Sequence, residues 1–174
     1  MIFNTYYWKR ELIRLARVLR RHMAQRQWRA SSDASVEKCV MLGFYAIRKM
    51  LESFNPALKS PERLRLTTFP TRRARLSPIA FPDVAEAFDL AKPRAESMLL
   101  RHVCNEVVHS YFFSLWVGPD RALRGIFFSS DQKKNKRVCR LDIEAIVTLF
   151  EGIARSRTAV SLAHFYPEHT RVIM

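Results

Sequence analysis

Apolar residues recur at helical spacing over the first part of the chain. Over residues 6–29, large apolar side chains fall on one face of a helix and arginines fall on the other. The same period returns over residues 31–54, which open with a Ser-Ser-Asp cluster suited to capping a helix and stop before Asn55-Pro56. Residues 1–54 are therefore expected to form two helices that pack as an antiparallel hairpin.

This periodicity is lost over residues 55–93, which hold six of the eight prolines. Proline lacks a backbone donor and interrupts helices and interior strands. The segment is therefore expected to be a long connection or an arm without long regular elements. Asp83 followed by Glu86 has the spacing of a capping box and predicts one short helix within it.

A helical pattern returns around residues 101–110. At about 100° per residue, Arg101, Asn105 and His109 lie along one ridge of the predicted helix, with His102 beside them. Apolar residues occupy the opposite face. Because core histidines normally lie within an apolar stripe, a polar face of this composition indicates a surface that meets a partner or a substrate.

Beyond this helix the pattern becomes that of β-strands. Residues 111–117, 123–130 and 137–141 are rich in aromatic and β-branched side chains, and turn-forming stretches separate them. They predict a three-stranded antiparallel meander. A further helix is expected after Asp142, and residues 157–174 show no clear pattern.

Together these segments predict one domain, residues 1–174, of the α+β class. The expected architecture is predominantly α-helical, a helical bundle with a small three-stranded antiparallel β-meander. A length of 174 residues and a hydrophobic content of 48% suffice for a single core. The expected parts are a basic helical hairpin (1–54), a proline-rich basic connection (55–93), the polar-faced helix with the meander and a C-terminal helix (94–156), and a tail (157–174).

The chain is strongly basic. It has 30 Lys and Arg against 16 Asp and Glu, which gives a formal net charge of +14 and a pI near 10.4. Such an excess attracts polyanions, nucleic acid first and an anionic membrane surface next. Three clusters, on the first helix, in the proline-rich connection and at a predicted hairpin tip, are expected to contact nucleic acid: Arg10, Arg14, Arg17 and Arg21; Arg72 and Arg73; and Lys133, Lys134, Lys136 and Arg137.

Residues 94–113 resemble the signature helix of the HEPN superfamily. That signature is an arginine, commonly followed by Asn, Asp or His, and then, after a short interval, a histidine on the same helix. Here Arg101-His102 matches the opening dipeptide and His109 matches the closing histidine. Seven residues separate Arg101 from His109, which is longer than the usual interval, and Asn105 lies near a position where an arginine is expected.

The resemblance implies a small helical domain that is often dimeric and in many members acts as a metal-independent ribonuclease. It implies that His109 is the general acid or base for an RNA 2′-hydroxyl and the leaving 5′-oxygen, and that Arg101 stabilises the phosphorane charge. Asn105 or His102 would orient the phosphate. Because such sites are usually completed across a dimer interface, a homodimer is also implied. In the structural alternative, His109 and Asn105 hydrogen-bond the following strand or a loop.

No metal or cofactor is expected. Glu106 and His109 have the Glu-x-x-His spacing of a carboxylate-bridged di-iron helix, but the sequence holds no second such motif. A zinc site that adds His102 lacks a convincing fourth ligand. The three cysteines are widely spaced and predict neither a disulfide framework nor a thiolate zinc site, which favours the cytoplasm. No apolar run is long enough for membrane insertion.

The sequence favours binding of nucleic acid, with RNA as the first expectation, through the basic clusters. Two alternatives stay open. The first is a metal-independent endoribonuclease of the toxin or antiphage type with His109 at its centre. The second is a non-catalytic protein-interaction or regulatory subunit whose basic faces bind an acidic protein. In any of these, a single basic cluster can also be an ordinary solvated surface.

Overall fold

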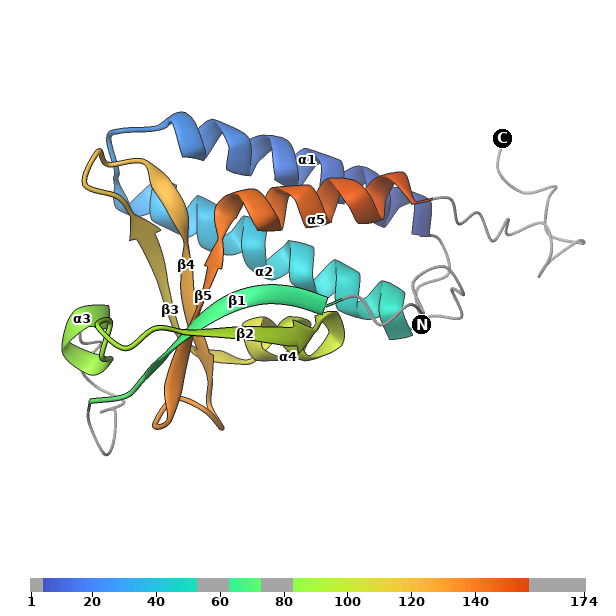
Figure 1. The fold of residues 1–174 in the computed structure, drawn as a ribbon. Helices are drawn as coiled ribbons and strands as arrows, with labels where there is room; N and C mark the ends of the chain where they lie inside the picture. The colour runs from blue at the N-terminus through green and yellow to red at the C-terminus, as the bar shows by residue number, and fades with distance from the viewer. Residues whose placement is uncertain (1–4, 53–62, 73–82, 157–174) are drawn as a thin grey trace, which may run out of the picture.

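The structure, a computed structural model, describes residues 5–52, 63–72 and 83–156 (Figure 1). None of the helices in these segments combines the length and the apolar character needed to cross a bilayer. The elements, in chain order, are α1 (Thr5–Ala24), α2 (Ala30–Glu52), β1 (Arg63–Pro70), α3 (Val84–Ala87), β2 (Arg94–Leu99), α4 (Leu100–Val108), β3 (Ser110–Val117), β4 (Leu123–Ser130), β5 (Arg137–Asp142) and α5 (Ile143–Arg155).

All five strands belong to one antiparallel sheet with the order β2-β1-β5-β4-β3. β3, β4 and β5 form a meander, and β1 pairs with both β5 and β2, which places β1 inside the sheet. Figure 1 shows β1 and β2 crossing the long strands of the meander at a large angle, so the sheet is strongly twisted. The two edges of the sheet are β2 and β3.

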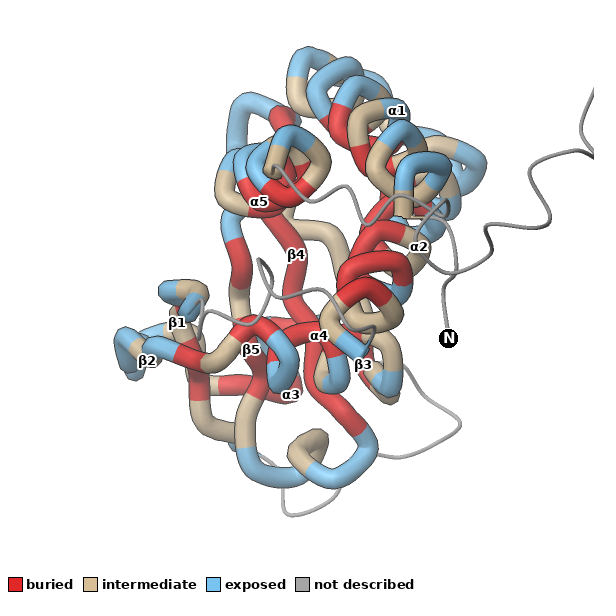
Figure 2. The backbone as a smooth tube through the Cα atoms, turned by 90° about the vertical axis from the view of Figure 1, so that its right-hand side faces the viewer, coloured by how far each residue is buried: buried red, intermediate tan, exposed pale blue. Residues whose placement is uncertain are grey.

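The main core lies between the sheet and the layer formed by α1, α2, α4 and α5 (Figures 1 and 2). α1 contributes a buried stripe that includes Leu12, Leu15 and Leu19. α2 and α5 approach each other where Gly43 faces Phe150. A β-carbon placed on Gly43 would overlap the Phe150 ring, so this close approach requires a glycine.

A second, smaller apolar cluster lies under α3. Phe88, which follows α3, packs edge-on against Phe112 of β3, with ring centroids 5.5 Å apart. Phe69, Phe127 and Val138 complete the cluster from the neighbouring strands. The sheet is therefore covered on one side by four helices and on part of the other side by α3.

The predicted architecture, a predominantly helical bundle with a three-stranded meander, is wrong. β3, β4 and β5 lie where the meander was expected, but β1 and β2 extend them to a five-stranded sheet. The error lies in the proline-rich connection, where Pro70 ends β1 and Pro93 directly precedes β2. Proline is tolerated at strand ends, so these prolines delimit strands instead of excluding them.

The polar-faced helix is also shorter than expected. β2 takes up residues 94–99, and α4 ends at Val108, with His109 as its C-cap residue. Ser110 already belongs to β3. The predicted tail, residues 157–174, lies outside the described residues.

Candidate nucleic-acid interface

α4 turns its apolar residues toward the core and its polar residues toward solvent. It starts directly after β2, with no side-chain hydrogen bond at its N-cap. The division follows the helical period of the sequence, because residues three and four apart share a face. The buried residues are Leu100, Val103, Cys104 and Val107, and the exposed ones are Arg101, His102 and Asn105.

The polar face of α4 forms one wall of a cleft of about 540 Å³. β2 and the start of β1 form a second wall, and the turn between β4 and β5 contributes the remaining residues. The cleft thus joins two residues predicted to be catalytic with two predicted to contact nucleic acid. The charged and polar side chains that decide its chemistry are Arg63, Glu96, His102, Asn105, Glu106, Lys133 and Arg137.

Arg137 is held in this cleft by two carboxylates. Its guanidinium group forms ion pairs with Glu96 and with Glu106, the latter with 3.2 Å between Nη2 and Oε1. Burial by itself lowers the pKa of Arg137, but the nearby Cys139, Glu106 and Glu96 together outweigh burial and raise that pKa above its ordinary value. The charge of Arg137 is therefore already balanced within the protein, and its contact with nucleic acid stays a prediction.

Two other cations of the cleft, Arg63 and Lys133, have no carboxylate partner among the residues that the structure describes. Arg63 donates to Ser97, with 3.1 Å from Nε to the side-chain Oγ and 2.5 Å from Nη2 to the carbonyl oxygen. His102 and Asn105 line the same space. Nitrogen donors from β1, α4 and the β4–β5 turn therefore line one cleft.

His109 does not line the cleft. Its Nε2 lies 2.9 Å from Nη1 of Arg48 on α2. Because an arginine can only donate, Nε2 is the acceptor and the ring proton is on Nδ1. Arg48 also pairs with Glu52, so His109 is tied to a network on α2. The sequence left open that His109 makes a structural hydrogen bond to the following strand or to a loop. In the structure this hydrogen bond joins His109 to a side chain of helix α2 instead.

The predicted ridge of α4 is consequently divided. Asn105 lines the cleft, whereas Arg101 is exposed and has no side-chain hydrogen bond or ion pair within the described chain. His109 contacts α2, so Asn105 is the residue of this ridge that lines the described cleft. The catalytic roles implied by the HEPN resemblance stay predictions.

The arginine face of α1 lies far from the cleft. Figure 1 places α1 at one end of the molecule and the β4–β5 turn, in orange, at the opposite end. The arginine face of α1 and the basic β4–β5 turn therefore do not meet in one groove within the described part of the chain. Arg14 is partly neutralised by an ion pair with Glu11. All four predicted arginines of this face are exposed: Arg10, Arg14, Arg17 and Arg21.

The β4–β5 turn holds its lysines in different ways. The ammonium group of Lys134 lies 3.7 Å from the centroid of the Tyr111 ring and pairs with Asp131. Lys136 is exposed, and Lys133 reaches the cleft. Lys133 is thus the lysine of this turn that lines the cleft with the polar face of α4, and it has no ion-pair partner within the described residues.

The basic cluster of the proline-rich connection is only partly described. Arg72 is anchored to Asp89, with 3.1 Å between Nη2 and Oδ1. Arg73 lies outside the described residues. A role of this cluster in nucleic-acid binding stays a prediction.

Sequence reasoning missed an arginine on the other face of the sheet. The guanidinium carbon of Arg140 lies 4.2 Å from the ring centroid of Trp116 and 5.5 Å from that of Phe69. Its Nη2 donates weakly to Thr67 at 3.4 Å, and its Nε has no hydrogen-bond partner in the described structure. The sequence signal that could have identified Arg140 is the period-two pattern of β5, which places Arg140 on the same face as Val138.

No protein-family model, curated protein or solved structure matches the chain. Among the residues whose positions are described, no three His, Cys, Asp or Glu side chains are grouped so that they could hold a metal ion.

Proposed function

We propose that the chain binds nucleic acid, with RNA as the first candidate, and that the cleft beside α4 takes a phosphate group of the backbone. Phosphate oxygens only accept hydrogen bonds, and this cleft offers donors from three separate elements. The proposal rests on one observation. Arg63 and Lys133, which have no carboxylate partner in the described chain, line the same cleft as His102 and Asn105.

The charge of the cleft suits a phosphodiester. Arg63, Lys133 and Arg137 contribute three positive charges, and Glu96 and Glu106 contribute two negative charges, so the sum is +1 with the histidine neutral. One backbone phosphate carries one negative charge. The net charge of +14 attracts the rest of the polyanion from a distance.

Binding is tested by fluorescence anisotropy with a labelled single-stranded RNA and the matching DNA at low salt. The variant Arg63→Ala/Lys133→Ala is expected to weaken binding by about tenfold for each side chain removed, because hydrogen bonds to charged groups contribute most. Lys92→Ala is the matched control, since Lys92 is exposed but pairs with Asp89 outside the cleft. Wild-type protein that binds neither strand would end the proposal, and an unchanged affinity of the double variant would remove the cleft from it.

A metal-independent ribonuclease is the second candidate. The observation that favours it is the position of His102, which lines the cleft with Asn105 and Lys133, so that a proton-transfer group lies beside donors that can stabilise phosphate charge. Mixed RNA is incubated with wild type, His102→Ala and His109→Ala in excess chelator. Loss of cleavage in His102→Ala alone assigns the cleft, and loss in His109→Ala alone assigns the role implied by the HEPN resemblance. Equal cleavage by all three proteins, or by none, ends the nuclease candidate.

A further inference from the structure

β3 is an edge strand that carries no charged residue and no proline. Its sequence from 110 to 117 is SYFFSLWV, and within the described residues it pairs only with β4. Phe112 to Trp116 pair without interruption, and register shifts occur only at the two ends. Edge strands usually carry charges or proline that prevent pairing with another chain. The opposite edge, β2, has Arg94 and Glu96 and follows Pro93, so only the β3 edge lacks this protection.

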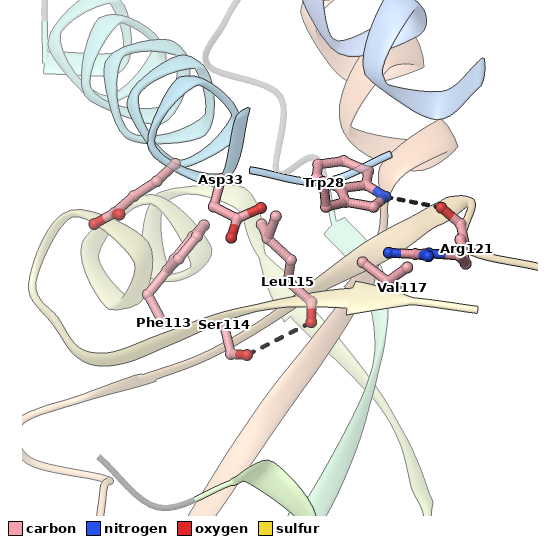
Figure 3. Close-up of a pocket in the computed structure, with 8 residues that line it drawn as sticks. Trp28, Asp33, Phe113, Ser114, Leu115, Val117 and Arg121 are labelled. Atoms are coloured by element: carbon pink, nitrogen blue, oxygen red, sulfur yellow. Dashed lines mark hydrogen bonds between the residues drawn. The ribbon is translucent and has the colours of Figure 1, made fainter. Parts of the chain in front are cut away.

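A pocket of about 500 Å³ runs along the same strand (Figure 3). Figure 3 shows Phe113, Leu115 and Val117 pointing from β3 into this pocket, with Trp28 facing them. Val117 is 37% exposed, whereas Phe113 and Leu115 are only partly buried against the core. An accessible apolar row therefore lies directly beside the unpaired edge.

The pocket has a basic end and an acidic end. The Trp28 indole donates to the Arg121 carbonyl at 2.8 Å, which fixes Arg121 near the C-terminal end of β3. α2 begins at Ala30 and runs away from Trp28, and Figure 3 shows Asp33 near Phe113 and Leu115. Glu37 also lines the pocket and follows Asp33 by one helical turn, so it lies further from Trp28 and Arg121, toward the start of β3. Neither acid, nor Arg121, has an ion-pair partner within the part of the chain that is described.

We propose that β3 pairs with β3 of a second copy of this chain, in antiparallel orientation, about a twofold axis close to Leu115. Each copy then uses the same surface, as a twofold dimer requires. Leu115 faces Leu115 of the second copy, and Phe113 faces its Val117. Because alternate residues of a strand share a face, these contacts join the two apolar rows into one. The two five-stranded sheets become one continuous sheet.

The charges of the pocket favour a second copy of this chain as the partner of β3. Antiparallel pairing reverses the direction of the pocket, so Arg121 of one copy comes to the end that holds Asp33 and Glu37 of the other. The same contact occurs twice because of the symmetry. A uniformly basic peptide would instead meet Arg121 at one end. Long-range repulsion between two basic copies is screened within about 8 Å at physiological salt, and the paired strands themselves are uncharged.

The first test measures the oligomeric state by light scattering on a sizing column over a series of protein concentrations. Wild type is expected to be a dimer that dissociates on dilution. Val117→Lys places a cation against Phe113 of the second copy and is expected to give a monomer. Ala95→Lys is the matched control, because Ala95 is exposed on the opposite edge strand, β2, and its substitution is expected to leave the dimer intact.

The second test reverses the charges and does not depend on the folding of Val117→Lys. Glu37→Lys and Arg121→Glu are each expected to raise the dissociation constant of the dimer about tenfold, because each change creates two like-charge contacts. The double variant restores opposite charges and is expected to return close to the wild-type value. The melting temperature of each variant is recorded to show that it is folded.

Three outcomes would overturn the proposal. They are a wild type that stays monomeric at every concentration, a dimer that survives Val117→Lys in folded protein, and a double charge-reversal variant that dimerises as weakly as the single variants. None of these measurements uses nucleic acid, so they are independent of the function proposed for the cleft.

Discussion

At the scale of single residues, Arg137 joins β5 to β2 and α4 through Glu96 and Glu106. Arg137→Ala leaves two carboxylates without their cation, and the Glu106 side chain is only 12% exposed. We expect the free energy of unfolding to fall by about 2–3 kcal/mol, since removing one partner of a buried ion pair leaves the other charge buried and unpaired. Urea denaturation measures this loss. Arg124→Ala, which breaks an exposed ion pair with Asp120, is expected to cost less than about 1 kcal/mol. Equal losses would contradict this view of Arg137.

The buried thiols predict how stability depends on pH. Burial raises the pKa of Cys104 and of Cys139 from 9.0 to about 12. Above pH 9 the unfolded chain loses these protons while the native protein keeps them, so stability falls as the pH rises from about 9 toward 12. At pH 10 the loss is about 1 kcal/mol for each thiol.

Cys139→Ala separates this effect from other groups that titrate in the same range. Urea denaturation at pH 8 and pH 10 is expected to show a smaller loss for the variant than for wild type, by about 1 kcal/mol. The substitution also removes core volume, but that cost is the same at both pH values. An identical pH dependence of the two proteins would show that the thiol does not contribute.

At the scale of elements, the contact between α2 and α5 depends on Gly43. Gly43→Ala places a β-carbon inside the Phe150 ring, and this overpacking is expected to lower the free energy of unfolding by about 1–3 kcal/mol. Gly152→Ala is the matched control, because Gly152 lies on an exposed part of α5 with no atoms nearby. It is expected to stabilise the protein by about 0.5–1 kcal/mol. If thermal denaturation showed that both variants gain stability, the packing of α2 on α5 would be different.

The elements that follow a local pattern were predictable, and β1 was not. Two long amphipathic stretches give α1 and α2, and aromatic and β-branched runs give the three strands of the meander. In β1, Leu64 and Leu66 alternate with Arg63 and Arg65, which is the period of a half-buried strand. The nearby prolines outweighed this short signal. β1 forms because β5 and β2 pair with it, and such long-range pairing is not written in the local sequence.

At the scale of the whole molecule, the twisted sheet decides which polar residues meet. The sequence placed His102 and Asn105 on one face of a helix, but it could not show that the β4–β5 turn brings Lys133 to them. The same fold places the β4–β5 turn at the opposite end of the molecule from α1 and ties Arg137 to two carboxylates. A nucleic acid that contacts both this cleft and the arginines of α1 would have to extend along the length of the molecule.

The salt dependence of RNA binding tests the phosphate contacts of the cleft most directly. The logarithm of the binding constant of a single-stranded RNA is plotted against the logarithm of the salt concentration for wild type and for Arg63→Ala/Lys133→Ala. Each phosphate contact on a single strand contributes about 0.7 to the slope, so loss of two contacts is expected to make the slope shallower by about 1.4. Lys92→Ala is expected to keep the wild-type slope. Equal slopes for wild type and the double variant would contradict the proposal that this cleft binds the nucleic-acid backbone.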